Sequence, residues 1–269
     1  MFEETARILF NQRVTADTWL LGMKSPKIAK SAQPGQFVMI RVRSSMDPLL
    51  RRPFSICGTE RDSFLVFYRV VGHGTAILTE AKGGEILSVL GPLGKGFELP
   101  TGDAIPVLVG GGIGVAPLFF LAQRLKKKKA LFMMGFATSR EVLSVPHMKG
   151  TRTKVSIATD DGSQGHAGFV TDLLEDYLVR SGVGEKRHLL FTCGPKAMMS
   201  KMADISSSRS IPCQFSLEAS MACGLGACLG CAIKAQESSG RAYVHVCKDG
   251  PVFRTEAIDW KELCMDRLK

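Results

Sequence analysis

The chain has 269 residues, 45% of them hydrophobic, and a formal net charge of +10 at pH 7. This length accommodates two or three small domains, and the hydrophobic fraction argues against large-scale disorder. The apolar runs are far shorter than the roughly 20 residues that a membrane span needs, and the start Met1-Phe2-Glu3-Glu4 shows no secretory signal. We therefore expect a cytoplasmic protein without a membrane span.

The positive charge raises the question of nucleic acid as a partner. One basic run, Lys126 to Lys129, ends a segment with helical periodicity. Lysines in a last helical turn complement the helix dipole and stay solvated. No Trp or Tyr that could stack on bases lies near the run. We expect no nucleic-acid partner, because a phosphate-rich cofactor and an anionic cluster would balance part of the charge.

Residues 1–101 read as a first domain of short β-rich runs. Residues 36–42, 63–70 and 85–90 are examples, and glycine or proline turns separate them. About six strands at this spacing predict an antiparallel barrel or sandwich. A short helix is expected over 75–81, capped by Thr75.

Two segments of this domain are candidates for binding a flavin. Arg51 to Ile56 places two guanidiniums and a hydroxyl at a strand entrance, and arginine forks match phosphate. Tyr68 to Thr75 offers a glycine turn and a helix start with free N–H groups. Each signal is weak alone, because such pairs and turns are common in β-proteins. His73 by itself is typical of a surface loop.

Residues 102–212 read as an α/β domain. A buried strand over 105–109, glycines at 110–114 and a helix over 118–127 follow one another. This order points a helix N-terminus at a phosphate. Val115 and Pro117 stand where a third glycine of the G-x-G-x-x-G fingerprint would fall, so the dinucleotide interpretation needs further support.

Three further strands in this domain supply that support. They are expected over 130–136, 154–159 and 188–192, with helical stretches such as 169–180 between them. Two of them end in Asp160 to Ser163 and Cys193 to Met198, and ligands bind outside the carboxyl ends of parallel strands. An α/β domain with ordinary turns stays the alternative. Cys193 is either a small buried residue or a neighbour of a nicotinamide.

Residues 213–269 carry four closely spaced cysteines out of eight in the chain. Cys223, Cys228 and Cys231 have the spacing C-x4-C-x2-C of plant-type 2Fe–2S proteins, and Cys247 is the candidate fourth ligand. Zinc is the alternative, although zinc ribbons usually have two C-x2-C pairs. The 15 residues between Cys231 and Cys247 form a shorter gap than a plant ferredoxin leads us to expect. Cys213 and Cys264 are expected to be inert.

The motifs together resemble a known superfamily. Arg-Pro-Phe-Ser at 52–55, the glycines at 110–114 and Cys-Gly-Pro at 193–195 look like ferredoxin–NADP reductases. The tail, residues 218–231 and 246–253, resembles the electron-transfer subunit of NAD-dependent (class 1B) dihydroorotate dehydrogenases. The resemblance covers essentially the whole chain. A related family, the small subunit of NADH-dependent ferredoxin–NADP oxidoreductases, tends to have aspartate where Cys223 stands.

This resemblance implies three domains, three cofactors and a set of site residues. FAD would be held by Arg52, Pro53, Phe54, Ser55, Phe67, Tyr68, Arg69, Gly74 and Thr75 of the barrel. Cys223, Cys228, Cys231 and Cys247 would hold the 2Fe–2S cluster of the C-terminal domain. NAD would bind near Gly111, Gly112, Gly114, Asp160, Cys193, Gly194 and Pro195 of the α/β domain.

It also implies a partner. An FMN-containing catalytic subunit would oxidise dihydroorotate, and electrons would pass through the cluster and FAD to NAD⁺, in a heterotetramer with two copies of each subunit. A diaphorase working alone or with another partner is one alternative, and a zinc-stabilised nucleotide-binding regulator is another. Arg140 followed by Glu141 favours NAD(H) over NADP(H), because the pair offers no basic cluster to a 2′-phosphate.

Overall fold

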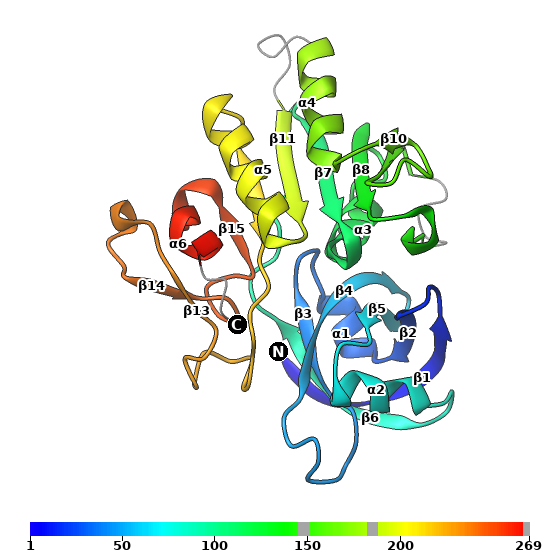
Figure 1. Cartoon of the computed structure of the whole chain (residues 1–269). Helices are drawn as coiled ribbons and strands as arrows, with labels where there is room; N and C mark the ends of the chain where they lie inside the picture. The colour runs from blue at the N-terminus through cyan, green and yellow to red at the C-terminus, as the bar shows by residue number, and fades with distance from the viewer. Residues whose placement is uncertain (145–150, 182–187, 266–269) are drawn as a thin grey trace.

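The N-terminal third of the chain closes into a β-barrel (Figure 1). The computed structural model describes residues 1–144, 151–181 and 188–265. Six antiparallel strands among them make the barrel in the order β1-β2-β5-β4-β3-β6, as expected. They are β1 (Phe2–Arg13), β2 (Thr18–Lys24), β3 (Phe37–Arg41), β4 (Arg52–Glu60), β5 (Ser63–Arg69) and β6 (Ile86–Leu93), with helices α1 (Pro26–Ser31) and α2 (His73–Glu80).

Both faces of β5 are buried, and this explains how the barrel meets the rest of the molecule. Phe64, Val66 and Tyr68 point into the barrel core. Leu65 and Phe67, on the opposite face, pack with helix α3 (Val115–Arg124) of the next domain. Successive strand residues alternate between faces, so this continuous apolar run supplies an inner core and an interdomain contact together.

A second sheet of seven strands, with order β10-β9-β8-β7-β11-β12-β15, follows the barrel within the described residues. Its strands are β7 (Ile105–Gly111), β8 (Ala130–Phe136), β9 (Thr153–Thr159), β10 (His166–Ala167), β11 (His188–Cys193), β12 (Cys213–Ser216) and β15 (Val252–Arg254). All neighbours are parallel except β12 and β15. The expected parallel-sheet domain is therefore confirmed.

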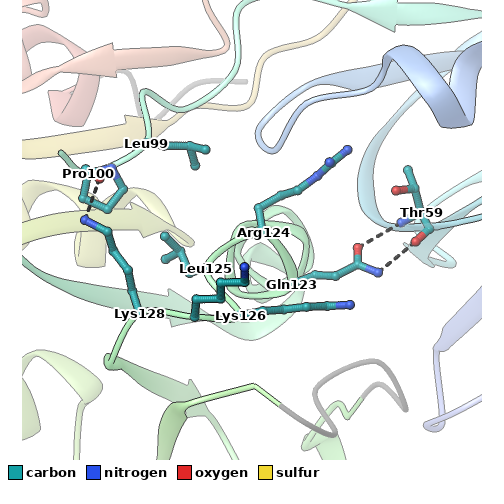
Figure 2. Close-up of a pocket in the computed structure, with 9 residues that line it drawn as sticks. Thr59, Leu99, Pro100, Gln123, Arg124, Leu125, Lys126 and Lys128 are labelled. Carbon is teal, nitrogen blue, oxygen red and sulfur yellow. Dashed lines mark hydrogen bonds between the residues drawn. The ribbon is translucent and has the colours of Figure 1, made fainter.

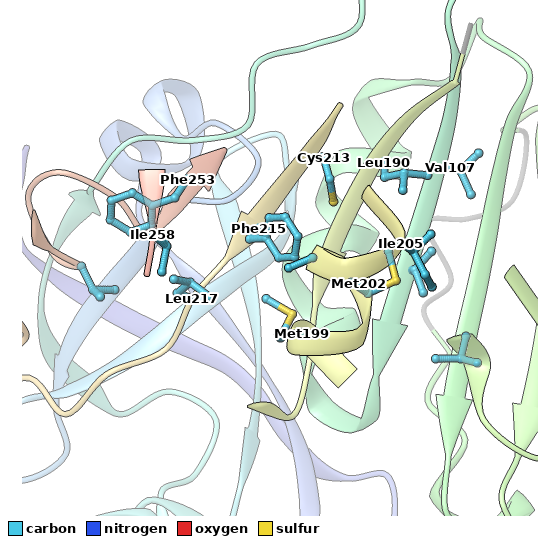
Figure 3. Packing of buried hydrophobic residues seen from close by; sticks show 14 of the residues in the cluster. Val107, Leu190, Met199, Met202, Ile205, Cys213, Phe215, Leu217, Phe253 and Ile258 are labelled. Atoms are coloured by element: carbon cyan, nitrogen blue, oxygen red, sulfur yellow. The ribbon is translucent and has the colours of Figure 1, made fainter. Parts of the chain in front are cut away.

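Helices cover both faces of this sheet. Helix α3 packs on one face. Helices α4 (Val170–Arg180) and α5 (Lys196–Ser208) pack on the other, with Val107, Leu190 and Phe215 of the sheet in the same core (Figure 3). Residues of β7 alternate between the two cores, as Val107 and Leu108 do. Covering both faces in this way is the usual arrangement of parallel sheets.

The C-terminal segment is joined to this sheet at two strands. Cys213 of β12 pairs with Leu190 of β11, and β15 extends the edge. Between them lie the short hairpin of β13 (Ala232–Lys234) and β14 (Tyr243–His245), and helix α6 (Trp260–Met265) ends the described chain. Single-turn 3-10 helices are η1 (Gly112–Gly114), η2 (Ser139–Glu141), η4 (Glu237–Ser239) and η5 (Thr255–Ala257). The division at residues 101 and 212 stays a prediction.

Two expected helices have different bounds. Helix α2 begins at His73, and Thr75 lies in its first turn, where its Oγ1 accepts the N–H of Gly72 at 3.2 Å and does not act as the N-cap. Helix α3 begins at Val115, three residues before the expected start at 118. Pro117 does not prevent this, because proline is tolerated in the first turn of a helix. It ends at Arg124, so the lysines from Lys126 follow it and do not form its last turn. In the described part of the chain, every helix is too short or too polar to cross a membrane.

Candidate functional site

A cavity of about 460 Å³ lies where the barrel, the parallel sheet and the C-terminal segment meet. Eight of the nine residues expected to hold FAD line it. They are Arg52, Pro53, Phe54, Ser55, Phe67, Tyr68, Arg69 and Thr75. The ninth, Gly74, lies behind Arg52: a Cβ on Gly74 would be 2.6 Å from the Arg52 Nε atom. Gly74 thus leaves the space that the Arg52 side chain occupies.

The two arginines at the start of β4 have different surroundings. Arg52 lines the cavity and donates from Nη1 to the carbonyl of Leu50 at 2.6 Å. Arg51 instead donates to Glu3 at 2.6 Å and to the carbonyl of Ser88 at 3.0 Å. Arg51 therefore already has anionic and carbonyl partners, whereas Arg52 faces the cavity, and a role for both guanidiniums at a phosphate stays a prediction.

Two packed aromatic rings form part of the cavity wall. Phe54 and Tyr68 pack edge to face with ring centroids 5.8 Å apart. The Tyr68 hydroxyl donates to Asn11 at 3.0 Å. Burial raises the pKa of Tyr68 to about 12, so the phenol stays protonated at neutral pH. Both rings therefore shape the cavity without adding charge to it.

Glu218 gives the cavity an acidic group that the sequence interpretation did not assign. Its side chain is accessible from the cavity. The surrounding protein nevertheless raises the pKa of Glu218, and this effect is larger than the lowering by the Arg69 guanidinium. The Glu218 charge also adds to burial in raising the pKa of the Cys193 thiol well above its usual range. Cys193 is only 1% exposed, so it is a neutral thiol at physiological pH.

The glycine loop after β7 and the Cys-Gly-Pro turn after β11 interlock. A Cβ on Gly114 would lie 2.5 Å from the Cys193 carbonyl oxygen, and one on Gly111 would lie 2.9 Å from Pro195 Cδ. Gly112 has φ +53°, a conformation that favours glycine. A Cβ on Gly194 would lie 3.0 Å from the Gly111 nitrogen. The structure thus brings together six of the seven residues expected near NAD.

The seventh of these residues, Asp160, stands apart from this group. It follows β9, and β8 lies between β9 and β7 in the sheet. Its backbone N–H donates to the Phe136 carbonyl at 3.0 Å. Asp160 and the glycine loop still share the carboxyl edge of the sheet, where nucleotides bind in such folds. An extended dinucleotide, unlike a compact ligand, is long enough for both.

The four expected cluster ligands lie on one loop and the hairpin after it. The Sγ atoms of Cys231 and Cys247 are 3.2 Å apart. The Cys223 sulfur accepts N–H groups of Leu225 at 3.3 Å and Cys228 at 3.4 Å. Burial raises the pKa of Cys223, but these N–H groups more than offset it and lower the pKa to about 6.

Sulfur atoms surrounded by N–H donors suit an anionic iron–sulfur cluster. Gly226 donates to the Cys247 sulfur at 3.1 Å, and the Cys247 N–H donates to Cys231 at 3.4 Å. Across the described residues, no three His, Cys, Asp or Glu side chains are arranged to hold a single metal ion. The fit to a cluster therefore rests on the donor chemistry of the loop.

The loop is buried on one side and exposed on the other. Cys231 and Cys247 are 2% and 3% exposed, whereas Cys228 lies at the surface. A Cβ on Gly224 would lie 2.7 Å from Met39 Cγ, so the loop packs closely against the barrel. Met221 lines the flavin cavity two residues before Cys223. One short segment, 217–223, thus joins the cavity to the cluster loop.

Comparisons with known proteins agree with this geometry. Residues 218–259 match the model of the iron–sulfur cluster binding domain of dihydroorotate dehydrogenase B. The electron transfer subunit of dihydroorotate dehydrogenase B (NAD(+)) from Caldanaerobacter subterraneus subsp. tengcongensis is 39% identical, over 94% of this chain and 97% of the relative. The same subunit from Geobacillus kaustophilus is 41% identical over 91% of this chain and 94% of the relative. The chain belongs to this family.

Solved structures give the same fold. An NADH-dependent reduced ferredoxin–NADP oxidoreductase superimposes with a TM-score of 0.82 at 30% identity, covering 98% of this chain and 94% of the other. A ferredoxin–NADP⁺ reductase from Plasmodium falciparum, with 13% identity and a TM-score of 0.63, shares the fold over 77% and 91%. As a member of the dihydroorotate dehydrogenase B family, this chain has all four expected cysteines within the matched iron–sulfur domain.

Sequence reasoning missed the part of the cavity wall that comes from outside the barrel. Ile113 and Ala116 come from the start of α3, and Leu217, Ala219 and Met221 come from the segment before the cluster loop. Their apolar side chains carry no chemical signal that marks them as lining a cavity. The signal that could have found them is position, since they adjoin the glycine loop and Cys223 in sequence.

Larger cavities of about 520 and 800 Å³ share no lining residue with the flavin cavity. The first lies at the far end of α3 (Figure 2). There Lys128 Nζ donates to the carbonyls of Pro100 and Gly102, both at 2.9 Å. Part of the basic run therefore fixes the linker between the first two domains, and the flavin site is assigned by chemistry, not size.

Proposed function

We propose that this chain is the electron-transfer subunit of an NAD-dependent dihydroorotate dehydrogenase in pyrimidine biosynthesis. In this reaction a partner FMN subunit oxidises dihydroorotate, and electrons pass through 2Fe–2S and FAD to NAD⁺. The observation that carries the proposal is the segment 217–223, which forms a wall of the flavin cavity and leads directly into the cluster loop. Two redox groups held this way would be neighbours in one chain.

The residues of the cavity have separable tasks in this proposal. Arg52 would bind the FAD pyrophosphate, because a guanidinium forms charge-assisted pairs with phosphate. Phe54 and Tyr68 would hold the ring system in a fixed plane. The interlocked loops at Gly111 and Cys193 would place a nicotinamide beside it. When bound, FAD supplies the ability to exchange single electrons on one side and a hydride on the other.

The cluster would be held by Cys223, Cys228, Cys231 and Cys247, and its exposed side would face a partner. Leu225 and Leu229 on that side are 43% and 59% exposed. The barrel, the α/β domain and the cluster segment account for the described residues, whereas an FMN-binding TIM barrel typically takes about 250 residues of its own. We therefore assign dihydroorotate oxidation to the partner, propose two copies of each subunit, and place the enzyme in the cytoplasm.

The test compares the chain alone with the chain co-expressed with the FMN subunit. Alone, it should contain FAD, iron and sulfide and should reduce ferricyanide with NADH, without oxidising dihydroorotate. With the partner, NAD⁺-dependent orotate formation should appear. A colourless chain that contains zinc would support the regulator alternative. Diaphorase activity without any dihydroorotate-dependent reaction in the complex would support the diaphorase alternative.

A further inference from the structure

The loop between β3 and β4 exposes a group of apolar side chains that the flavin site does not use. Met46, Leu49 and Leu50 are 76%, 60% and 46% exposed. None of the three lines the flavin cavity. Exposed apolar groups of this kind often mark an interaction surface.

This β3–β4 loop, residues 42–51, is held in place by its charged residues. Arg43 pairs with Glu80 at 3.7 Å, and Arg51 pairs with Glu3 at 2.6 Å. Asp47 contacts His73 Nε2 at 3.2 Å. Each charged side chain of the loop thus has a partner on a neighbouring element. Burying an unpaired charge is costly. A protein that covered the three apolar side chains would avoid this cost, because each nearby charge already has a partner.

The cluster loop packs on strand β3 of the barrel, from whose end the β3–β4 loop starts. Gly224 packs on Met39 of β3, and Met39 is directly opposite Pro53 of β4 in the barrel. Leu50 precedes Pro53 by three residues, about 10 Å of extended chain. The β3–β4 loop projects from the end of the barrel away from the parallel sheet (Figure 1). Strand β3 therefore leads from the cluster loop, which carries Leu225 and Leu229, to the β3–β4 loop, which carries Leu50.

The cluster loop alone is too small for a stable interface, so a partner must also cover surface beside it. Two exposed leucines fall far short of the roughly 800 Å² that each partner buries in a standard interface. On one side of the loop, residues 236–242 of the β13–β14 connection are exposed and mostly polar or charged. On the other side lies the β3–β4 loop with its three exposed apolar side chains. Residues 236–242 include no large exposed apolar side chain, and interface cores are more apolar than their rims, so the barrel side is the better fit.

We infer that the FMN-containing partner subunit docks on a face that includes the exposed apolar side chains of Met46, Leu49 and Leu50 together with those of Leu225 and Leu229. The inference rests on the proposed function and extends it from the cluster to the flavin barrel. The partner would then touch two domains, which would fix its orientation as well as its distance from the cluster.

The test uses the full chain with its cofactors and the variant Met46→Glu/Leu49→Glu. We expect its dissociation constant for the FMN subunit, measured by titration calorimetry, to rise at least about tenfold. Its FAD and iron contents and its NADH–ferricyanide activity should equal those of the wild type. Val179→Glu, at a 68% exposed apolar position on α4, is the matched control and should leave the dissociation constant unchanged.

Three outcomes would overturn the inference. The dissociation constant could stay within twofold of the wild type. FAD content could fall, which would mean that the loop covers the cofactor. The double variant could instead abolish self-association of the isolated chain, which would identify a second copy as the occupant. Failure of the proposed function looks different, because the wild-type chain would then neither bind the FMN subunit nor support orotate formation. Leu225→Glu tests the cluster side separately.

Discussion

The Sγ atoms of Cys231 and Cys247 lie 3.2 Å apart, although 15 residues separate them in the sequence. The hairpin of β13 and β14 brings them together, since Ala232 pairs with His245 and the Val246 N–H donates to the Cys231 carbonyl at 3.1 Å. The 15 residues between Cys231 and Cys247 thus form a hairpin, and this hairpin brings Cys247 back to the loop that holds the other three cysteines.

This geometry predicts that Cys247→Ser removes most of the bound iron, because a 2Fe–2S cluster needs four ligands and Cys247 is the one supplied by the far end of the hairpin. Iron and sulfide analysis of anaerobically purified protein measures the effect. Cys213→Ser and Cys264→Ser are controls outside the loop and should keep wild-type iron. Equal iron in Cys247→Ser and the controls would falsify the assignment of Cys247.

A second prediction separates two adjacent arginines. Arg52→Ala should weaken FAD binding by about 10- to 100-fold, because a charge-assisted contact to phosphate contributes roughly 1.5–3 kcal/mol. Arg51→Ala is the matched control, since Arg51 binds Glu3 and Ser88 outside the cavity. Flavin titration of the two apoproteins measures both constants.

The flavin released by heat should also run as FAD on chromatography. Release of FMN would contradict the pyrophosphate role of Arg52. Equal losses of FAD affinity in Arg51→Ala and Arg52→Ala would contradict the prediction that only the arginine lining the cavity binds FAD.

The sequence predicted the parts of this fold that depend on local patterns. The apolar runs of β5 and β7 predicted strands, and the glycines at 110–114 predicted the loop between β7 and α3. The cysteine spacing predicted that Cys223, Cys228 and Cys231 lie on one short loop, which the structure shows, while their role as ligands stays a prediction.

Features that depend on tertiary contacts were not predictable in this way. Helix α3 was expected to be amphipathic, yet all residues from Val115 to Ala122 are buried, because the barrel covers the face that would otherwise be solvated. Arg51 and Arg52 look alike in sequence, and only the positions of Glu3 on β1 and Ser88 on β6 separate their surroundings. Glu218 begins the segment 218–231 that carries the resemblance, but the sequence does not show that it lines the flavin cavity, because other walls of that cavity come from the barrel and the start of α3.

A third prediction concerns the nicotinamide cofactor. Asp161 accepts the Oγ–H of Ser163 at 2.6 Å and its N–H at 2.9 Å, and these bonds lower the pKa of Asp161. The Ser163 hydroxyl also accepts the N–H of Ser139 in the loop after β8. A carboxylate fixed at this edge would repel a 2′-phosphate. The value of kcat/KM for NADPH should be about tenfold below that for NADH, equivalent to roughly 1.4 kcal/mol.

Asp161→Asn should narrow this difference by raising kcat/KM for NADPH while leaving the NADH value nearly unchanged. Asp176→Asn on the outer part of α4 is a control of equal charge change. Comparable wild-type rates with both cofactors in a steady-state ferricyanide assay would contradict the prediction.

The last prediction follows from the raised pKa of Glu218. A carboxyl group whose pKa is higher in the folded than in the unfolded chain binds its proton more tightly when folded. Its contribution to stability is therefore complete below the ordinary pKa of glutamate and is lost as pH rises through the folded value.

Glu218→Gln cannot lose this contribution, since the amide does not titrate. Its melting temperature relative to the wild type should therefore increase between pH 4.5 and pH 8. Glu237→Gln, on the exposed β13–β14 connection, is the control, and its difference from the wild type should be the same at both pH values. Parallel melting curves for Glu218→Gln and the wild type would show that solvent in the cavity hydrates Glu218 as fully as bulk water does.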